Sequence, residues 1–198
     1  MLDDADRKLS DFELAQRAGE GDEFAFAEIV RRHSPRVFRF AARFFRQRAL
    51  VEEAAQEVFL KAFLQLKNFE GRGSLEGWLT RITINICLNL LRSAKRQPEL
   101  KISDLSDDEN QWLEIHSAPF AVAEQQSNAE KEVAADLVHK VLGSMSPDDQ
   151  LVLTLIDGEG VSIKELAEQT GWSESKVKVT AFRARRKMRR VIEKLLSN

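Results

Sequence analysis

Five polar residues recur at helical spacing near the middle of the chain, and their types could bind a nucleic acid. They are Arg81, Asn85, Asn89, Arg92 and Arg96. Steps of three and four residues place side chains on one face of a helix. Arginine pairs with phosphates and guanines, and asparagine can hydrogen-bond to the edge of a base. The stripe holds no carboxylate, so it indicates a nucleic-acid-binding face or, alternatively, a polar helix face near solvent.

A glycine-rich loop and a long helix are expected to position this stripe. Gly71, Gly73 and Gly77 mark the loop, and Ser74 is of a residue type that caps helix N-termini. Pro98 is expected to end the helix. Apolar residues beside the polar stripe predict that the helix is largely buried; they are Trp78, Leu79, Ile82, Ile84, Ile86, Leu88, Leu90 and Leu91.

Four helices are expected before this loop. Asp11 and Asp22 are the predicted N-caps of the first two, and Pro35 is predicted in the first turn of the third. The fourth is expected over residues 52–66, with a buried face of Ala55, Val58, Phe59, Ala62, Phe63 and Leu66. Its outer face holds Glu53, Gln56, Glu57 and Lys61. Such a face is either soluble surface or a docking face for a basic partner.

The C-terminal part has the pattern of a helix-turn-helix. Ser162 can cap a short helix, Gly171 suits the turn, and Ser173 can cap a second, strongly basic helix. The predicted buried side of that second helix consists of Val177, Ala181, Ala184, Met188, Val191 and Leu195. Its predicted outward side consists of Lys176, Lys178, Thr180, Arg183, Arg186 and Lys187. A basic amphipathic helix can also lie on a membrane, but the capped helix and the tight turn favour DNA.

Charge is distributed unevenly along the 198 residues, although the net charge is only -2. Seven arginines and no acid lie between positions 29 and 51. Nine basic residues and one acid lie between positions 176 and 194. Residues 97–132 hold nine acids and two lysines. We therefore predict an all-α protein with two small helical domains, residues 11–96 and 129–198. An acidic flexible linker, residues 97–128, is expected to join them.

Several classes of protein are disfavoured by the sequence pattern and by residue spacing. No period-two alternation predicts a strand, and the lone Cys87 cannot form an internal disulfide. No residues have metal-ligand or nucleophile–base spacing, so no cofactor and no enzymatic activity are expected. No signal peptide or long apolar run occurs, which predicts a cytosolic protein.

Four segments together resemble the extracytoplasmic-function class of bacterial RNA polymerase sigma factors, reduced to the second and fourth sigma domains. They read LAQRAGEGDEFAFAEIVRRHSPRVFRFA, VEEAAQEVFLKAF, FEGRGSLEGWLTRITINICLNLLR and SIKELAEQTGWSESKVKVTAFRARRKMRR. The resemblance rests on all four in this order. It implies core RNA polymerase, promoter DNA and an anti-sigma factor as partners, and no small-molecule substrate, because the polymerase supplies the active site.

The resemblance also implies three groups of site residues. Contacts to core polymerase would come from Glu53, Gln56, Glu57, Phe59 and Leu60. Contacts to the single-stranded −10 element would come from Asn68, Phe69, Arg72, Ser74, Trp78, Arg81, Asn85, Asn89 and Arg92. Contacts to the double-stranded −35 element would come from Ser173, Ser175, Lys176, Lys178, Thr180, Arg183 and Arg186.

Some of these assignments leave alternatives open. Phe69 and Trp78 are candidates to stack on bases, although Trp78 can equally be a core residue. Lys176 and Thr180 depart from the threonine and arginine common at these places in the family, so the −35 base preference stays open. The acidic linker can be a plain spacer or can follow the polymerase's positively charged channel.

Two other functions compete with this one. A helix-turn-helix regulator with a sensing or dimerisation domain would explain the C-terminal half equally well, but not the Arg/Asn stripe or the acidic helix. A nucleic-acid enzyme is disfavoured because clustered carboxylates or metal ligands are missing from the sequence.

Overall fold

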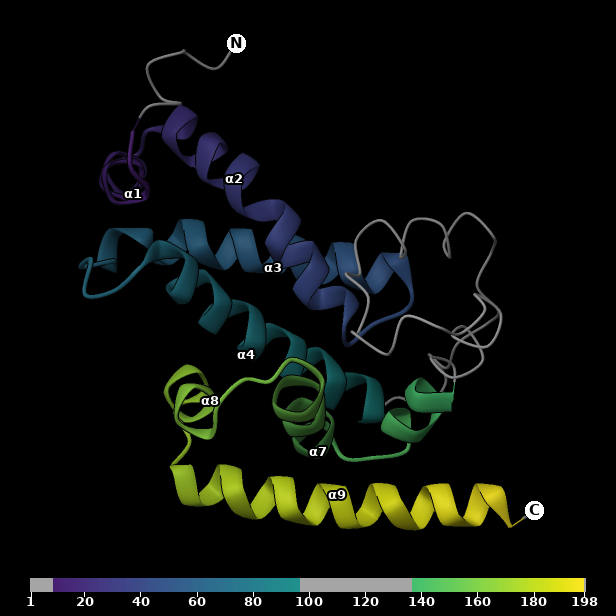
Figure 1. Ribbon diagram of the computed structural model, residues 1–198. Coiled ribbons are helices and arrows are strands. Elements are labelled where there is room, and N and C mark those ends of the chain that lie inside the picture. Colours follow the sequence, from purple (N-terminus) through teal and green to yellow (C-terminus); the bar gives the residue numbers. More distant parts are fainter. Residues whose placement is uncertain (1–8, 97–136, 198) are drawn as a thin grey trace, which may run out of the picture. The chain divides into compact units, whose positions relative to one another are not determined.

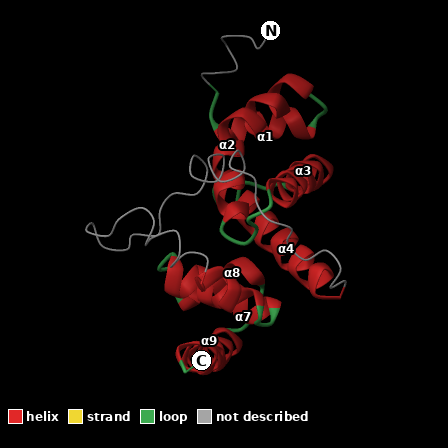
Figure 2. Ribbon diagram, turned by 90° about the vertical axis from the view of Figure 1, so that its right-hand side faces the viewer, coloured by secondary structure: helices red, strands yellow, loops and turns green. Residues whose placement is uncertain are grey.

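The computed structural model describes residues 9–96 and 137–197, and every regular element in those ranges is a helix (Figures 1 and 2). The chain divides into two compact units, with the boundary between positions 118 and 119. The all-α prediction is therefore confirmed for the described residues. The predicted linker and residues 129–136 lie outside them. No described helix has the length and apolar character that crossing a membrane requires.

The first unit is a bundle built around three long helices. Its elements are α1 (Asp11–Gly19), α2 (Glu23–Ala42), α3 (Arg48–Gln65), the short 3-10 helix η2 (Leu66–Asn68) and α4 (Leu75–Arg96). Helices α2, α3 and α4 pack on one another, while α1 packs on α2 and η2. Fully buried side chains in its core include Ile29, Val51, Val58, Ile84 and Ile86. Each such side chain contributes about 1.5–3 kcal/mol when it leaves water.

The second unit contains the helix-turn-helix. Residues 137–143 are helical and are followed by α7 (Pro147–Val152), the π-helical η4 (Leu153–Gly158), α8 (Ile163–Thr170) and α9 (Glu174–Leu196). Helices α7 and α8 and the η4 turn pack on α9. The turn between α8 and α9 is made by Gly171, whose φ of 73° lies in the left-handed region that favours glycine. The predicted helix-turn-helix is confirmed.

Most of the predicted helix caps are confirmed. The hydroxyl groups of Ser162 and Ser173 and the carboxylate of Asp22 accept hydrogen bonds from backbone N–H groups in the first turns of their helices. Asp11 is the exception, because α1 is capped by Ser10 in a capping box with Glu13. In this box the Ser10 hydroxyl accepts from the backbone N–H of Glu13, and the Glu13 carboxylate accepts from the backbone N–H of Ser10.

The predicted third helix, beginning at Pro35, is wrong. Helix α2 continues through this proline without a break. A proline inside a helix removes one backbone hydrogen bond. Here the buried side chains of His33, Val37 and Phe40 hold both halves of α2 against the bundle, and Pro35 lies on the exposed side.

The predicted buried face of the fourth helix is also wrong at one position. Helix α3 begins at Arg48, four residues before the predicted start, and Phe63 is 45% exposed. Small residues at Ala54, Ala55 and Ala62 form the buried contact instead. The Phe63 ring packs edge-on against Phe26, with ring centroids 5.0 Å apart.

Candidate nucleic-acid interface

The polar stripe on α4 lies on the side of the helix that faces solvent. Arg81 and Asn89 are exposed, and Asn85 and Arg92 are partly buried. The side-chain nitrogen of Asn85 donates a hydrogen bond to the carbonyl of Arg81 at 3.0 Å, which leaves the side-chain oxygen to accept another. No ion pair joins Arg81 to another residue of the described ranges. This face therefore offers a guanidinium group for a phosphate and amide groups for base edges.

Trp78 lies at the loop end of this face. It lies three residues before Arg81 and seven before Asn85, so the three share one side of α4. The indole is half-buried, and its ring centroid lies 5.5 Å from that of Phe69, which is half-buried too. Two partly accessible aromatic rings thus lie where the loop meets the Arg/Asn stripe. Aromatic rings in such places can stack on unpaired bases.

The loop before α4 has a defined conformation. Ser74 accepts a hydrogen bond from the backbone N–H of Gly77 at 3.0 Å, as the sequence predicts for an N-cap. Gly71 has a φ of 69°, which other residues rarely adopt. Arg72 is mostly exposed and pairs with Glu70 at 2.5 Å. Asn68 is exposed at the end of η2.

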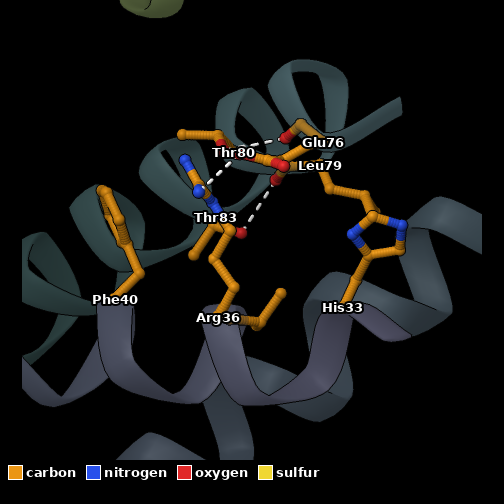
Figure 3. A pocket seen from close by; sticks show the side chains of 8 residues that line it. His33, Arg36, Phe40, Glu76, Leu79, Thr80 and Thr83 are labelled. Carbon is orange, nitrogen blue, oxygen red and sulfur yellow. Dashed lines mark hydrogen bonds and ion pairs between the residues drawn. The ribbon is translucent and has the colours of Figure 1, made fainter. Parts of the chain in front are cut away.

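A small pocket lies between α2 and the start of α4 and is too small for a ligand (Figure 3). Its volume of about 10 Å³ has room for about one water molecule. Arg36 of α2 pairs with Glu76 of α4 at 2.5 Å across it. Thr80 and Thr83 donate hydrogen bonds to carbonyl groups of their own helix. The Arg36–Glu76 pair joins α2 to the first turn of α4, and because both side chains are about half exposed it contributes at most about 1 kcal/mol.

One face of α3 combines exposed acids with exposed apolar side chains. Glu53, Gln56 and Glu57 are exposed, and Phe59 is half-buried. Leu60 is 61% exposed and Leu64 is 63% exposed. The sequence interpretation missed Leu64 and the exposure of Phe63. A signal was available, because residues 58–64 hold more apolar side chains than one buried helix face can take.

The N-terminal half of α9 presents the predicted polar face. Ser175, Lys176, Lys178, Arg183 and Arg186 are exposed, and Thr180 is partly exposed. Ser173 acts as the N-cap and accepts from the backbone N–H of Lys176 at 3.2 Å. The ammonium group of Lys176 lies 3.7 Å from the Trp172 ring centroid. Lys178 lies 3.5 Å from Glu174.

Two further cations of α9 are held by acids of the same unit. Arg185 binds Asp157 through two nitrogens, with the shortest distance 2.7 Å. Lys187, predicted on the outward side, binds the buried Asp149 at 2.5 Å. The second half of the predicted buried side is only partly correct, because Met188 and Val191 are half-buried and Leu195 is 50% exposed. Some basic residues of α9 therefore bind acids within the unit, and others are exposed on its surface.

Cys87 is fully buried in the first unit. Burial raises the pKa of Cys87 far above its ordinary value, so its thiol is not poised as a nucleophile. Among residues 9–96 and 137–197, no three histidine, cysteine or acidic side chains are grouped to hold a metal ion.

Comparison with known proteins identifies both units. Residues 29–97 match the family model Sigma-70 region 2, and residues 135–188 match Sigma-70, region 4. The RNA polymerase sigma-H factor of Pseudomonas aeruginosa is 28% identical over 188 residues, which cover 94% of this chain and 95% of that protein. The ECF RNA polymerase sigma-E factor of Escherichia coli K12 is 27% identical over 189 residues, covering 96% and 97%.

Two solved structures share the fold. CnrH, in complex with the cytosolic domain of CnrY, gives a TM-score of 0.57 at 24% identity and covers 92% of this chain and 97% of its own. The sigma factor RpoE of Bartonella quintana, in complex with the anti-sigma factor NepR, gives 0.53 at 19% identity and covers 85% and 96%. The two matched regions occur in one chain, at the length of the sigma-H and sigma-E relatives. This chain therefore belongs to the sigma-70 family of RNA polymerase sigma factors, in its extracytoplasmic-function (ECF) class.

Proposed function

We propose that this chain is an alternative transcription initiation factor, which binds core RNA polymerase, directs it to promoters through −10 and −35 elements and helps to open the DNA. One observation carries the proposal furthest: the solvent-facing Arg81–Asn85–Asn89 stripe of α4 adjoins the half-buried rings of Phe69 and Trp78. The first unit would correspond to residues 11–96 and the second to residues 129–198. The polymerase performs the nucleotide chemistry in this proposal, and the chain contributes no catalytic group or cofactor.

The first unit would hold the melted −10 element. Unstacking a base costs a few kcal/mol, and this cost must be offset by new contacts. Stacking on an aromatic ring contributes about 1–3 kcal/mol per base, and Arg81 and Arg92 can bind the phosphates. The proposed −10 contacts are Asn68, Phe69, Arg72, Ser74, Trp78, Arg81, Asn85, Asn89 and Arg92. The Ser74 hydroxyl already accepts a hydrogen bond from the backbone N–H of Gly77 in the first turn of α4, so a contact to DNA would be shared with this cap.

The second unit would bind the −35 element with α9 in the major groove. The N-terminal residues of a recognition helix meet base edges, whereas exposed arginines farther along meet phosphates. Ser175, Lys176, Lys178 and Thr180 are therefore assigned to bases, with Ser173 at the helix start, and Arg183 and Arg186 to phosphates. The contact of Lys176 with Trp172 supports a fixed position for its ammonium group.

Docking on core polymerase is assigned to α3. This helix presents a polar face of Glu53, Gln56 and Glu57, and Phe59 and Leu60 extend it with apolar surface. Such a face suits a partner with basic and apolar side chains. The relative RpoE was solved with the anti-sigma factor NepR. We extend this relationship to the present chain: an anti-sigma factor would cover its docking faces until the chain is released.

Binding to core polymerase separates this function from that of an ordinary helix-turn-helix regulator. We expect the purified full-length chain to form a 1:1 complex with core polymerase on size exclusion. Reversing one charge with Glu57→Lys is expected to weaken this complex by roughly tenfold, whereas Glu20→Lys, an exposed acid in the turn after α1, leaves it unchanged. Failure of the wild-type chain to bind core polymerase would favour the regulator.

A further inference from the structure

Helix α1 contacts both the loop that enters α4, residues 69–74 (the −10 loop), and the η2 turn that precedes it. Gly19 of α1 lies against the backbone of η2, and a Cβ atom at position 19 would lie 3.3 Å from the Cα of Lys67. Within the loop, a Cβ atom at Gly71 would overlap the ring of Phe12, whose Cδ2 would be only 2.8 Å away. Figure 1 shows α1 beside this loop. Helix α1 therefore packs on η2 and on the first half of the loop.

Aromatic rings continue this contact from α1 to α4. The Phe12 centroid lies 6.5 Å from that of Phe69, and the Phe69 centroid lies 5.5 Å from that of Trp78. Ring pairs at 4.5–7 Å in tilted arrangements attract one another beyond simple burial. Phe12 is nevertheless 45% exposed, so packing of the core does not explain an aromatic residue at this position.

Helix α1 is itself fixed to α2 through the residue next to Phe12. The carboxylate of Asp11 lies 3.1 Å from Arg32 and 3.0 Å from Nε2 of His33. Arg32 also donates to the carbonyl of Leu9 at 2.8 Å. At the other end of α1, Arg17 pairs with Asp22 at 2.6 Å. The Phe12 ring is thus presented to the loop by a helix that is anchored at both ends.

We infer that Phe12 is a positioning residue for promoter recognition: it holds the −10 loop in the conformation that receives an unpaired base. Phe12 does not touch the base itself in this arrangement. It supports Phe69 and keeps the backbone at Gly71 in its left-handed conformation. The inference rests on the proposed function, because the loop is a base-binding site only if the chain opens promoters.

The test compares base preferences of the reconstituted holoenzyme on a promoter library randomised over both elements. We expect Phe12→Ala to reduce discrimination at one −10 position by roughly tenfold while the −35 preference stays that of the wild type. Phe24→Ala is the matched control, because Phe24 is 60% exposed and has no ring contact with another described aromatic residue. It should leave both preferences unchanged. If Phe12→Ala does not fold, Phe12→Leu keeps the apolar bulk and should show a smaller loss at the same position.

A second pair of substitutions separates positioning from general instability. Gly71→Ala places a methyl group against the Phe12 ring and should relax the same −10 position, whereas Gly73→Ala has nothing within 4 Å and should not. In the Phe12→Ala background the methyl group no longer meets a ring. The effect of Gly71→Ala there should be smaller than in the wild type, although the strain of the positive φ remains.

Wild-type −10 preferences in a folded Phe12→Ala or Phe12→Leu holoenzyme would overturn the inference and leave the proposed function intact. Equal losses at the −10 and −35 elements would also overturn it, because they indicate loss of folded protein. A wild-type chain that gives the polymerase no promoter preference would instead contradict the proposed function.

Discussion

Lys187 of α9 binds Asp149 of α7 at 2.5 Å, and this pair ties the first turn of one helix to the middle of the other. The Asp149 side chain is 6% exposed, whereas that of Lys187 is 55% exposed. Burial alone would raise the pKa of Asp149, but the hydrogen bonds from Lys187 and Ser146 outweigh it and hold that pKa below its ordinary value. The lysine that the sequence assigns to the outward face thus also stabilises the unit.

Replacing Lys187 is expected to destabilise the second unit. Lys187→Met leaves a buried carboxylate with one partner fewer, which costs about 1–3 kcal/mol. Hydrogen exchange of amides in α7 and α9 would report this loss without interference from the first unit. Because the lowered pKa stabilises the fold only above the ordinary aspartate value near 4, the difference from wild type should shrink as pH falls below it. Arg189→Met, at an exposed arginine, is the control; an equal effect there would contradict the assignment.

Glu28 should make the first unit sensitive to acid. Its carboxylate is fully buried, with Arg31 at 2.6 Å and Arg32 at 2.8 Å. The hydrogen bond from Arg31 outweighs burial and, with that from Arg32, lowers the pKa of Glu28 to about 2. This stabilisation is complete above the ordinary glutamate pKa, roughly 4.3, and is lost as pH falls toward 2.

Urea unfolding of the full-length chain at several pH values would show this dependence. The free energy of unfolding should fall between pH 4.3 and 2 in the wild type, and Glu28→Gln should lower it at neutral pH and flatten the slope below pH 4.3. Glu53→Gln changes an exposed acid of α3 and should keep the wild-type slope. An unchanged slope in Glu28→Gln would show that the buried pairs do not govern acid unfolding.

Local signals were sufficient to predict the helix boundaries of the helix-turn-helix but not the packing of the first unit. Capping by Ser162 and Ser173 and the left-handed turn at Gly171 mark the helix boundaries. These signals depend only on a few neighbouring residues, so they can be recognised in the sequence. Pro35 misleads for the opposite reason, since contacts made by distant helices outweigh its local cost. Hydrophobicity alone would place Glu28 at the surface and Phe63 in the core. Instead two arginines neutralise the buried carboxylate of Glu28, and the partly exposed Phe63 ring packs against Phe26.

The candidate site likewise has features that local sequence patterns predict and features that depend on contacts between distant segments. The Arg/Asn stripe of α4 follows from helical periodicity alone; in the structure Arg81 and Asn89 are exposed, and Asn85 and Arg92 are partly buried. Sequence spacing does not show that the Trp78 ring packs near Phe69, or that Phe12 lies over Gly71, because those contacts join α1, a loop and α4. Which cations of α9 are bound by acids likewise depends on helices far apart in the sequence.

Asn85→Ala should weaken promoter opening more than duplex binding. Asn85 lies on the exposed stripe, with its amide oxygen free to accept, so its contact with an unpaired base forms only after melting. Permanganate reactivity of thymines in the −10 element should fall severalfold. Binding of the holoenzyme to the closed duplex should change by less than about twofold. Ala94→Ser, at an exposed position on the side of α4 opposite to Asn85, should change neither. Equal losses in both measurements would remove Asn85 from the −10 site.

Arg186 should act on the −35 element through phosphate. Arg186→Ala is expected to weaken holoenzyme binding similarly across −35 sequences and to reduce the slope of log affinity against log salt by about 0.9. Ser175→Ala should instead change the base preference and leave the salt slope alone. A changed base preference in Arg186→Ala would reassign this arginine from phosphate to base contact.

Promoter-selective transcription is the defining property of the proposed initiation factor. The purified full-length chain would be added to core RNA polymerase and a promoter library, and the start sites of the transcripts would be mapped. We predict transcripts that begin at a fixed distance from a shared pair of −10 and −35 sequences, absent with core polymerase alone. Transcripts with the same random start sites with and without the chain would contradict its assignment as an initiation factor.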